Sequence, residues 1–345
     1  MNKRNIALAV AISLVVSTLL AYTMNKGTEV AASDTVRIGY FPNISHAQAL
    51  VGIARGTFEQ ELGNTTNIQY KTFGAGPSAV EALFTNQVDI TYVGPSPAIN
   101  GYIRSDGNLK IIAGAASGGA VFVVRNDANI QSPADFAGKK FASPQYGNTQ
   151  DISLKSYIID HGYRLAQHGG SVHVLSAKNS DIMTLFLKKE IDGAWVPEPW
   201  GTLLVKNANG KIFVDERDLW EDGEFATTLL VVSNRFLQER PDLVKKVLKA
   251  HVETTIWINA NPEQAEQLVN EQLEKILHRP LPDDVLRESF SRMKFTYGLM
   301  KPSVIRFAEE GYSLDLLGRD KPDLSGIYYT ELLSEVLREK NLPFQ

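Results

Sequence analysis

The sequence of 345 residues contains no cysteine. This absence excludes disulfides, thiolate metal ligands and cysteine nucleophiles, and also the lipid-modified cysteine that anchors many exported proteins. Basic residues are not in excess either, because 35 Lys and Arg stand against 39 Asp and Glu, for a formal net charge of -4. Without a basic surplus the chain has little with which to neutralise phosphates, so we expect no nucleic-acid partner.

Long hydrophobic runs are confined to the N-terminus. Lys3 and Arg4 precede an uncharged apolar stretch at residues 6–22, which is the pattern of an export signal. Small residues before Ser33 predict cleavage there, although the stretch is long enough to remain as a membrane anchor. We interpret residues 1–32 as a signal peptide or N-terminal anchor. The rest of the chain is then periplasmic, or held at the outer face of the inner membrane if the signal is not cleaved.

The remaining length exceeds one ordinary core and predicts two domains. Short β-branched runs alternate with helical patterns, which is typical of an α/β fold with parallel sheets and crossover helices. Candidate strands lie at residues 36–40, 68–73, 88–93, 109–113, 121–124, 140–143, 172–175, 191–196 and 227–232. The C-terminal third predicts helices at residues 241–259, 262–276, 283–292, 302–311 and 327–339, several of them opened by Pro.

The order of these elements indicates one lobe interrupted by another. We expect lobe 1 at residues 33–121 and 228–345 and lobe 2 at residues 122–227, with the chain crossing between them near 121–125 and 224–232. Two such linkers form a hinge, and ligands bind in the cleft between hinged lobes.

Four segments share one pattern: a strand, a turn with Gly or Pro and a small polar residue, and a helix start. They are residues 40–46, 73–78, 93–97 and 143–149. In parallel sheets such turns lie at the carboxyl ends of the strands, where ligands bind. Their free backbone N–H groups and helix dipoles favour an anion without any Lys or Arg. The alternative is that the Ser and Thr residues of these turns only cap their helices.

A fifth segment, residues 192–200, ends a strand with two tryptophans around a carboxylate. Trp200 would hold an alkyl tail of a ligand, and Glu198 would accept a hydrogen bond from a ligand amine. The alternative is that both tryptophans pack in the core or hinge and that Glu198 is solvated. For Trp195 we expect the core.

In the order of these motifs, the chain resembles the nitrate, sulfonate and taurine binding proteins of ABC importers. The motifs are the strand and loop at 36–46, Phe-Gly-Ala-Gly-Pro from 73, Gln-Val-Asp-Ile at 87–90 with Gly-Pro-Ser-Pro at 94–97, and Asp-Gly-Ala at 192–194 with Glu-Pro-Trp at 198–200. The resemblance runs from about residue 36 to past residue 307. It implies a class II periplasmic-binding-protein fold whose cleft closes on an anion and delivers it to a membrane permease with its ATPase. We expect a monomer that is not an enzyme and holds no cofactor or metal.

The motifs and the resemblance together predict a set of ligand-binding residues. The set is Asn43, Ser45, His46, Gly76, Pro77, Ser78, Pro95, Ser96, Gly118, Gly119, Ala120, Tyr146, Asn148, Thr149, Glu198 and Trp200. The Gly-Pro-Ser-Pro motif lacks the acidic residue that often follows this strand in sulfonate binders. We predict an organosulfonate such as taurine or an alkanesulfonate, with nitrate, phosphonate, bicarbonate and a heterocyclic precursor left open.

Other functions fit the sequence less well. Residues 74–79 match a dinucleotide-binding pattern, but they follow the second strand, and Gly94 replaces the acidic residue expected after the next one. His161, His168 and His173 lack the tight spacing of a metal site. No G-x-S-x-G elbow of a hydrolase occurs. Thiamine-pyrimidine synthases share the fold, but the resemblance implies a cysteine-rich active site in them. A membrane-tethered ligand sensor of the same fold remains an alternative.

Overall fold

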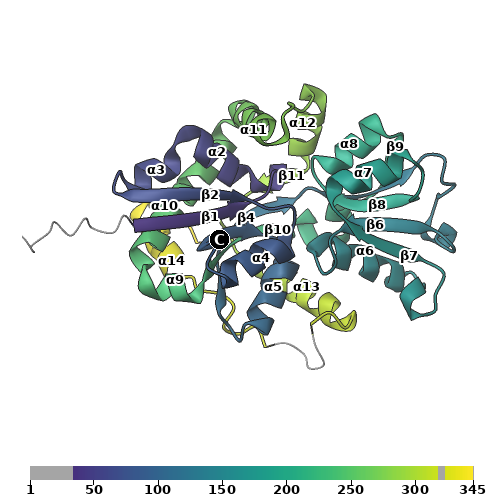
Figure 1. The fold of residues 1–345 in the computed structure, drawn as a ribbon, viewed down its shortest axis with the longest axis horizontal. Coiled ribbons are helices and arrows are strands. Elements are labelled where there is room, and N and C mark those ends of the chain that lie inside the picture. The colour runs from purple at the N-terminus through teal and green to yellow at the C-terminus, as the bar shows by residue number, and fades with distance from the viewer. Residues whose placement is uncertain (1–33, 318–322, 345) are drawn as a thin grey trace, which may run out of the picture.

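The computed structural model describes residues 34–317 and 323–344, which form two α/β lobes lying side by side (Figure 1). The first lobe holds a 6-stranded sheet in the order β11-β4-β10-β3-β1-β2, and the second a 5-stranded sheet in the order β7-β6-β8-β5-β9. The predicted two-lobe α/β architecture is therefore confirmed. The predicted signal segment lies outside the described residues, and none of the helices within them is long and apolar enough to cross a membrane.

Each sheet is mixed and contains a parallel half. The strands of the first sheet are β1 (Asp34–Tyr40), β2 (Thr66–Thr72), β3 (Ile90–Val93), β4 (Leu109–Gly118), β10 (Ala226–Ser233) and β11 (Met293–Phe295). Those of the second are β5 (Ala120–Arg125), β6 (Lys140–Pro144), β7 (His173–Ala177), β8 (Gly193–Pro197) and β9 (Gly210–Asp215). The neighbours β2, β1 and β3 are parallel, as are β7, β6 and β8. All the predicted strands are present, whereas β9 and β11 were not predicted.

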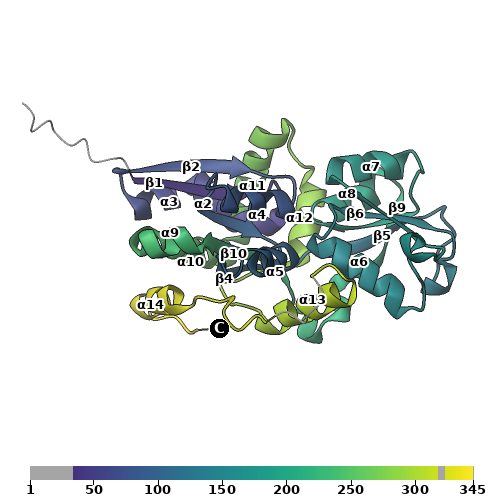
Figure 2. The same ribbon diagram turned by 60° about the horizontal axis from the view of Figure 1, so that its bottom comes forward.

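Helices cover both sheets (Figure 2). Their bounds are α2 (Ala47–Arg55), α3 (Thr57–Leu62), α4 (Gly76–Phe84), α5 (Pro95–Arg104), α6 (Thr149–Asp160), α7 (Asn179–Leu187), α8 (Trp200–Asn207), α9 (Asn234–Glu239), α10 (Pro241–Ala260), α11 (Pro262–Leu277), α12 (Asp283–Ser291), α13 (Lys301–Ser313) and α14 (Glu331–Glu339). Each predicted C-terminal helix is present. Helix α14 begins later than predicted because the carbonyl of Ile327 and the N–H of Tyr329 bond to Ile111 of β4.

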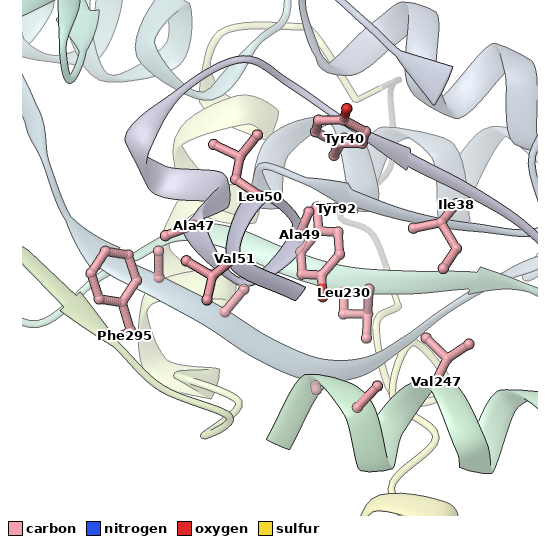
Figure 3. Packing of buried hydrophobic residues seen from close by; sticks show 14 of the residues in the cluster. Ile38, Tyr40, Ala47, Ala49, Leu50, Val51, Tyr92, Leu230, Val247 and Phe295 are labelled. Carbon is pink, nitrogen blue, oxygen red and sulfur yellow. The ribbon is translucent and has the colours of Figure 1, made fainter. Parts of the chain in front are cut away.

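The core of the first lobe lies between its sheet and helices α2 and α10. Ile38, Tyr92 and Leu230 come from the strands, and they face Leu50 of α2 and Val247 of α10 (Figure 3). All five are fully buried. Burial of one such apolar side chain stabilises the fold by about 1.5–3 kcal/mol.

The second lobe has an aromatic core. The ring of Trp195 in β8 is stacked on Phe122 of β5 at a centroid distance of 5.4 Å, and it is fully buried. Its Nε1 donates to Oε2 of Glu216 at 2.6 Å. The sequence-based expectation that Trp195 packs in the core is confirmed.

The chain crosses from the first sheet to the second at two adjacent glycines. Gly118 ends β4 and Gly119 precedes β5, so this crossing lies before the expected span of 121–125, because β5 pairs wholly within the second sheet. Both glycines have left-handed backbones, with φ of 78° and 72°. A Cβ on Gly118 would overlap the backbone oxygen of Arg292, and one on Gly119 would overlap the flexible side chain of Met293. The crossing therefore requires glycine for its conformation and for its packing.

The C-terminal segment forms a further link between the lobes. Helix α12 packs against α8, and α13 packs against α6 (Figures 1 and 2). The chain returns to the first sheet through two short 3-10 helices, η4 (Glu216–Leu219) and η5 (Glu221–Gly223), which precede β10. The second lobe is thus connected to the first by the two crossings and by the packing of α12 and α13 against it.

We predict that Gly118→Ala destabilises the protein more than Gly138→Ala does. Gly138 has a similar φ of 77°, but no atom lies within 4 Å of the position of its added Cβ. The control should lose only the left-handed penalty of about 1–2 kcal/mol, whereas Gly118→Ala adds overpacking against the backbone of about 1–3 kcal/mol. Urea unfolding of the two variants measures the difference, and equal losses would contradict the packing argument.

Candidate ligand-binding site

A narrow cavity lies between the lobes, at the carboxyl ends of the parallel strands. The first lobe lines it with Phe41, Asn43, Ser45, His46, Gly74, Ala75, Gly94 and Thr227. The second lobe contributes Pro144, Asn148, Thr149, Gln150, Asn179 and Pro197. The volume of the cavity is about 20 Å³, which leaves room for little more than one water-sized group. The lobes are therefore closed, and entry of a ligand requires them to part.

Helix N-termini from both lobes converge on this cavity. The lining residues Ala75, Gly94 and Asn148 precede α4, α5 and α6, and Asn179 is the first residue of α7. Ser45 and His46 lie just before α2. The first N–H groups of a helix have no partner within it and carry partial positive charge. The main chain thus directs hydrogen-bond donors and positive dipole ends toward one small space.

The cavity is almost free of ionisable side chains. Among the described residues that line it there is no Lys, Arg, Asp or Glu, and His46 is the one titratable group. Nδ1 of His46 accepts a hydrogen bond from the N–H of Phe41 at 3.3 Å. Burial lowers the pKa of His46 to about 3, so its ring is neutral at physiological pH. The proton then sits on Nε2, which makes the ring one more neutral donor.

Two polar atoms of the lining are buried without a hydrogen-bond partner. They are Oγ1 of Thr149 and Oδ1 of Asn179, in residues that are 2% and 8% exposed. Oγ of Ser96, in the first turn of α5, is also buried and unpartnered. Most buried polar groups in proteins are hydrogen-bonded, so such atoms indicate where a ligand group supplies the partner.

A buried ion pair fixes the loop before α6. The carboxylate of Asp151 accepts hydrogen bonds from Ser143 Oγ at 2.8 Å, from the N–H of Gly147 at 2.9 Å and from Nζ of Lys155 at 2.6 Å. The charge of Lys155 is therefore paired with Asp151, and Lys155 is not one of the lining residues. Tyr146, on the same loop, is 61% exposed and is not among the lining residues. Nζ of Lys155 lies over its ring, 4.3 Å from the ring centroid.

The lobes touch directly across the cleft. Nε1 of Trp200 donates to Oδ1 of Asn43 at 3.3 Å. Gly94 faces Thr149 so closely that a Cβ there would overlap the threonine hydroxyl. A Cβ on Gly76 would meet Oδ1 of Asn148 at 3.0 Å. Closure thus depends on small residues at the helix starts of the first lobe.

The structure brings together part of the predicted set. Asn43, Ser45, His46, Asn148 and Thr149 line the cavity. Gly76, Pro77, Ser78, Pro95 and Ser96 lie in the first turns of α4 and α5, just behind the lining. The hydroxyl of Ser78 donates to the carbonyl of Ala75 at 2.8 Å, so it is used within its own helix turn. Gly118, Gly119 and Ala120 lie at the crossing between the sheets.

Glu198 occupies neither of the places expected for it. It is fully buried, not solvated, and its carboxylate faces α12 instead of the cavity. It accepts hydrogen bonds from Thr202, from Ser289 Oγ at 3.1 Å and from Nη1 of Arg292 at 3.0 Å. Burial raises the pKa of the Glu198 carboxyl, and these donors oppose that rise. With its oxygens occupied, the carboxylate joins the lobes and is not a receptor for a ligand amine.

Some lining residues were not in the predicted ligand-binding set. Within the segments singled out from the sequence lie Phe41, Gly74, Ala75, Gly94, Pro144 and Pro197, and Gln150 is a direct neighbour of the predicted Thr149. Asn179 and Thr227 belong to neither group. The turn before Asn179 contains neither Gly nor Pro, so the search for such turns missed it; its position directly after a predicted strand was the available signal. In the part of the chain that the structure describes, no group of three or more His, Asp or Glu side chains is placed to hold a metal ion.

Comparisons with known proteins agree with this geometry. The taurine-binding periplasmic protein of Escherichia coli is 27% identical over 234 residues, which cover 68% of this chain and 69% of that protein. The alkanesulfonate-binding protein from Xanthomonas axonopodis pv. citri, solved bound to MOPS, has a TM-score of 0.73 at 16% identity and covers 87% of this chain and all of its own. The nitrate-binding protein from Synechocystis PCC 6803 has a TM-score of 0.72 at 14% identity, with 90% of each chain covered.

The two solved structures share the fold, and so the predicted periplasmic-binding-protein fold is confirmed. The model of the NMT1-like family matches residues 29–271, which include both parallel half-sheets and every residue that lines the cavity. Because this match spans well over half of the sequence, the chain belongs to the NMT1-like family.

Proposed function

We propose that this protein is the extracytoplasmic solute-binding protein of an ABC importer. It captures a small organosulfonate, such as taurine or an alkanesulfonate, in the cleft between its lobes and is not an enzyme. The observation that carries the proposal is the convergence of helix N-termini from both lobes on a cavity lined, among the described residues, by no charged side chain. Taurine, alkanesulfonates and nitrate, which the relatives' names mention, all present several anionic oxygens.

Neutral donors suffice for such a ligand. Hydrogen bonds to an ionised acceptor are about twice as strong as neutral ones, and they strengthen further when water is excluded. A single negative charge is spread over the sulfonate oxygens, and each oxygen can accept from a different helix start. A buried Lys or Arg would instead require its own compensation whenever the site is empty.

Closure of the two lobes links binding of the anion to its transfer to the permease. The anion docks on the turns before α2, α4 and α5, and the second lobe then brings the start of α6 over it. Differential affinity for the closed form shifts the population toward closure. The closed form, which differs in shape from the open one, presents the anion to the permease and its ATPase subunits.

Replacement of Thr149 by Val should weaken anion binding. The substitution keeps the shape of the side chain and removes a hydroxyl that is buried without a protein partner. Loss of one hydrogen bond to a charged group costs about 1.5–3 kcal/mol, an affinity loss of roughly 10-fold or more. Thermal-shift screening of small sulfonates, nitrate and phosphonates identifies a ligand, and calorimetry measures its Kd. Thr184→Val, on the exposed side of α7, is the matched control; equal affinities in both variants would remove Thr149 from the site.

Gly94→Ala should also weaken binding, because its methyl group would meet the Thr149 hydroxyl and hold the lobes apart. Gly74→Ala adds a methyl group at the same cavity where no atom lies within 4 Å, and it should retain more affinity. Small-angle scattering with saturating ligand then compares the closure of the two variants. If Gly94→Ala closes and binds like the control, contact between the lobes does not govern capture.

The affinity for a sulfonate should be constant from about pH 5 to pH 8. His46, the one titratable lining residue, has a pKa of about 3 and stays neutral over this range. Stability behaves differently: the unfolded chain binds protons at His46 below about pH 6.5 and the folded chain does not, so the contribution of His46 to the free energy of unfolding falls as the pH falls toward 3. Glu216, whose pKa burial raises to about 7, opposes this trend above about pH 4.5, so the net fall is expected below that pH. Calorimetry and urea unfolding across the range test both. A tenfold change in Kd would reveal a titrating group at the site.

A further inference from the structure

Asn179 is the feature of the cavity that anion binding alone does not explain. It is the first residue of α7, it lines the cavity, and it is 8% exposed. Its Oδ1 is buried and has no hydrogen-bond partner. The Nδ2 group of Asn179 is a donor that could bind an anion, but the buried unpartnered atom is the oxygen, which accepts hydrogen bonds and therefore requires a donor from the ligand.

The oxygens of two other lining amides already accept hydrogen bonds within the protein. Oδ1 of Asn43 accepts from Nε1 of Trp200 at 3.3 Å, and Oε1 of Gln150 accepts from Nδ2 of Asn148 at 3.0 Å. These bonds hold the two amides in fixed orientations. Oδ1 of Asn179 has no such hydrogen bond, so this oxygen is available to a donor on a ligand.

The carboxylates closest in sequence to the lining are also occupied. Asp151 is paired with Lys155 at 2.6 Å, and Glu198 with Arg292 at 3.0 Å. Both acids are fully buried and face away from the lining, in which the described residues include no acid. A ligand ammonium enclosed here would therefore lack a counter-charge, which disfavours its burial strongly.

We propose that Asn179 determines specificity by accepting a hydrogen bond from an uncharged donor next to the anionic head of the ligand. The ligand class is then a short hydroxyalkanesulfonate, with its sulfonate at the helix starts and its hydroxyl at Asn179. An aminoalkanesulfonate of the same length is bound less tightly. This inference rests on the proposed function and narrows it.

Three ligands with the same head and tail length test the proposal by calorimetry: 2-hydroxyethanesulfonate, ethanesulfonate and taurine. The wild-type protein should bind the hydroxyl compound about 5-fold or more tightly than the other two, which corresponds to one net hydrogen bond. Asn179→Leu, which keeps the size of the side chain, should abolish that preference and leave ethanesulfonate within about 3-fold of wild type. Asn179→Asp should shift the preference toward taurine, because it introduces a counter-charge.

Ser180→Ala is the control, since Ser180 is exposed in the same helix turn and its substitution should leave all three affinities unchanged. Wild-type protein that binds ethanesulfonate or taurine as tightly as the hydroxyl compound overturns this inference and leaves the proposed function standing. The inference is likewise overturned if Asn179→Leu weakens all three ligands equally, because the amide then binds the head group. If no small anion binds at all, the proposed function fails and the inference fails with it.

Discussion

The proposed function places one constraint on the structure: a space between two lobes must receive a negative charge from groups that carry no full positive charge. Parallel strands meet this constraint because their carboxyl ends lie at one edge of the sheet, where the following helices begin. Here β1, β2 and β3 of one lobe and β6, β7 and β8 of the other supply those ends. Two half-sheets facing each other thus place several helix dipoles around one cavity.

Three buried acids near the cavity lie outside its lining, two of them in ion pairs and one among neutral hydrogen-bond donors. Asp151 and Lys155 form a buried pair that holds the loop before α6. Glu198 and Arg292 form another, which ties β8 to the end of α12. Glu216 is buried with hydrogen bonds from Trp195 and Ser153, and burial raises its pKa to about 7. These buried groups hold the backbone around the site. The positive potential in the cavity then comes from the main-chain N–H groups and helix dipoles.

Closure sets the second constraint. The lobes are in contact where Gly94 faces Thr149 and where Asn43 bonds to Trp200. In addition, α12 packs against α8 and α13 packs against α6 of the second lobe. The cavity is small because these contacts are close.

The sequence by itself determined the two-lobe α/β plan, most of the strands and helices, and the turns before α2, α4, α5 and α6, because hydrophobic periodicity, glycine and proline are local signals. Of the residues that it predicted to bind a ligand, five line the cavity: Asn43, Ser45, His46, Asn148 and Thr149. Only the tertiary structure decided the places of Glu198 and Asn179. Glu198 turns away because Ser289 and Arg292, about ninety residues later in the chain, reach its carboxylate. Asn179 lines the cavity because β7 ends beside β6 and carries its helix start to the shared edge. Both outcomes depend on which distant segments pack together, and a local pattern contains no information about that.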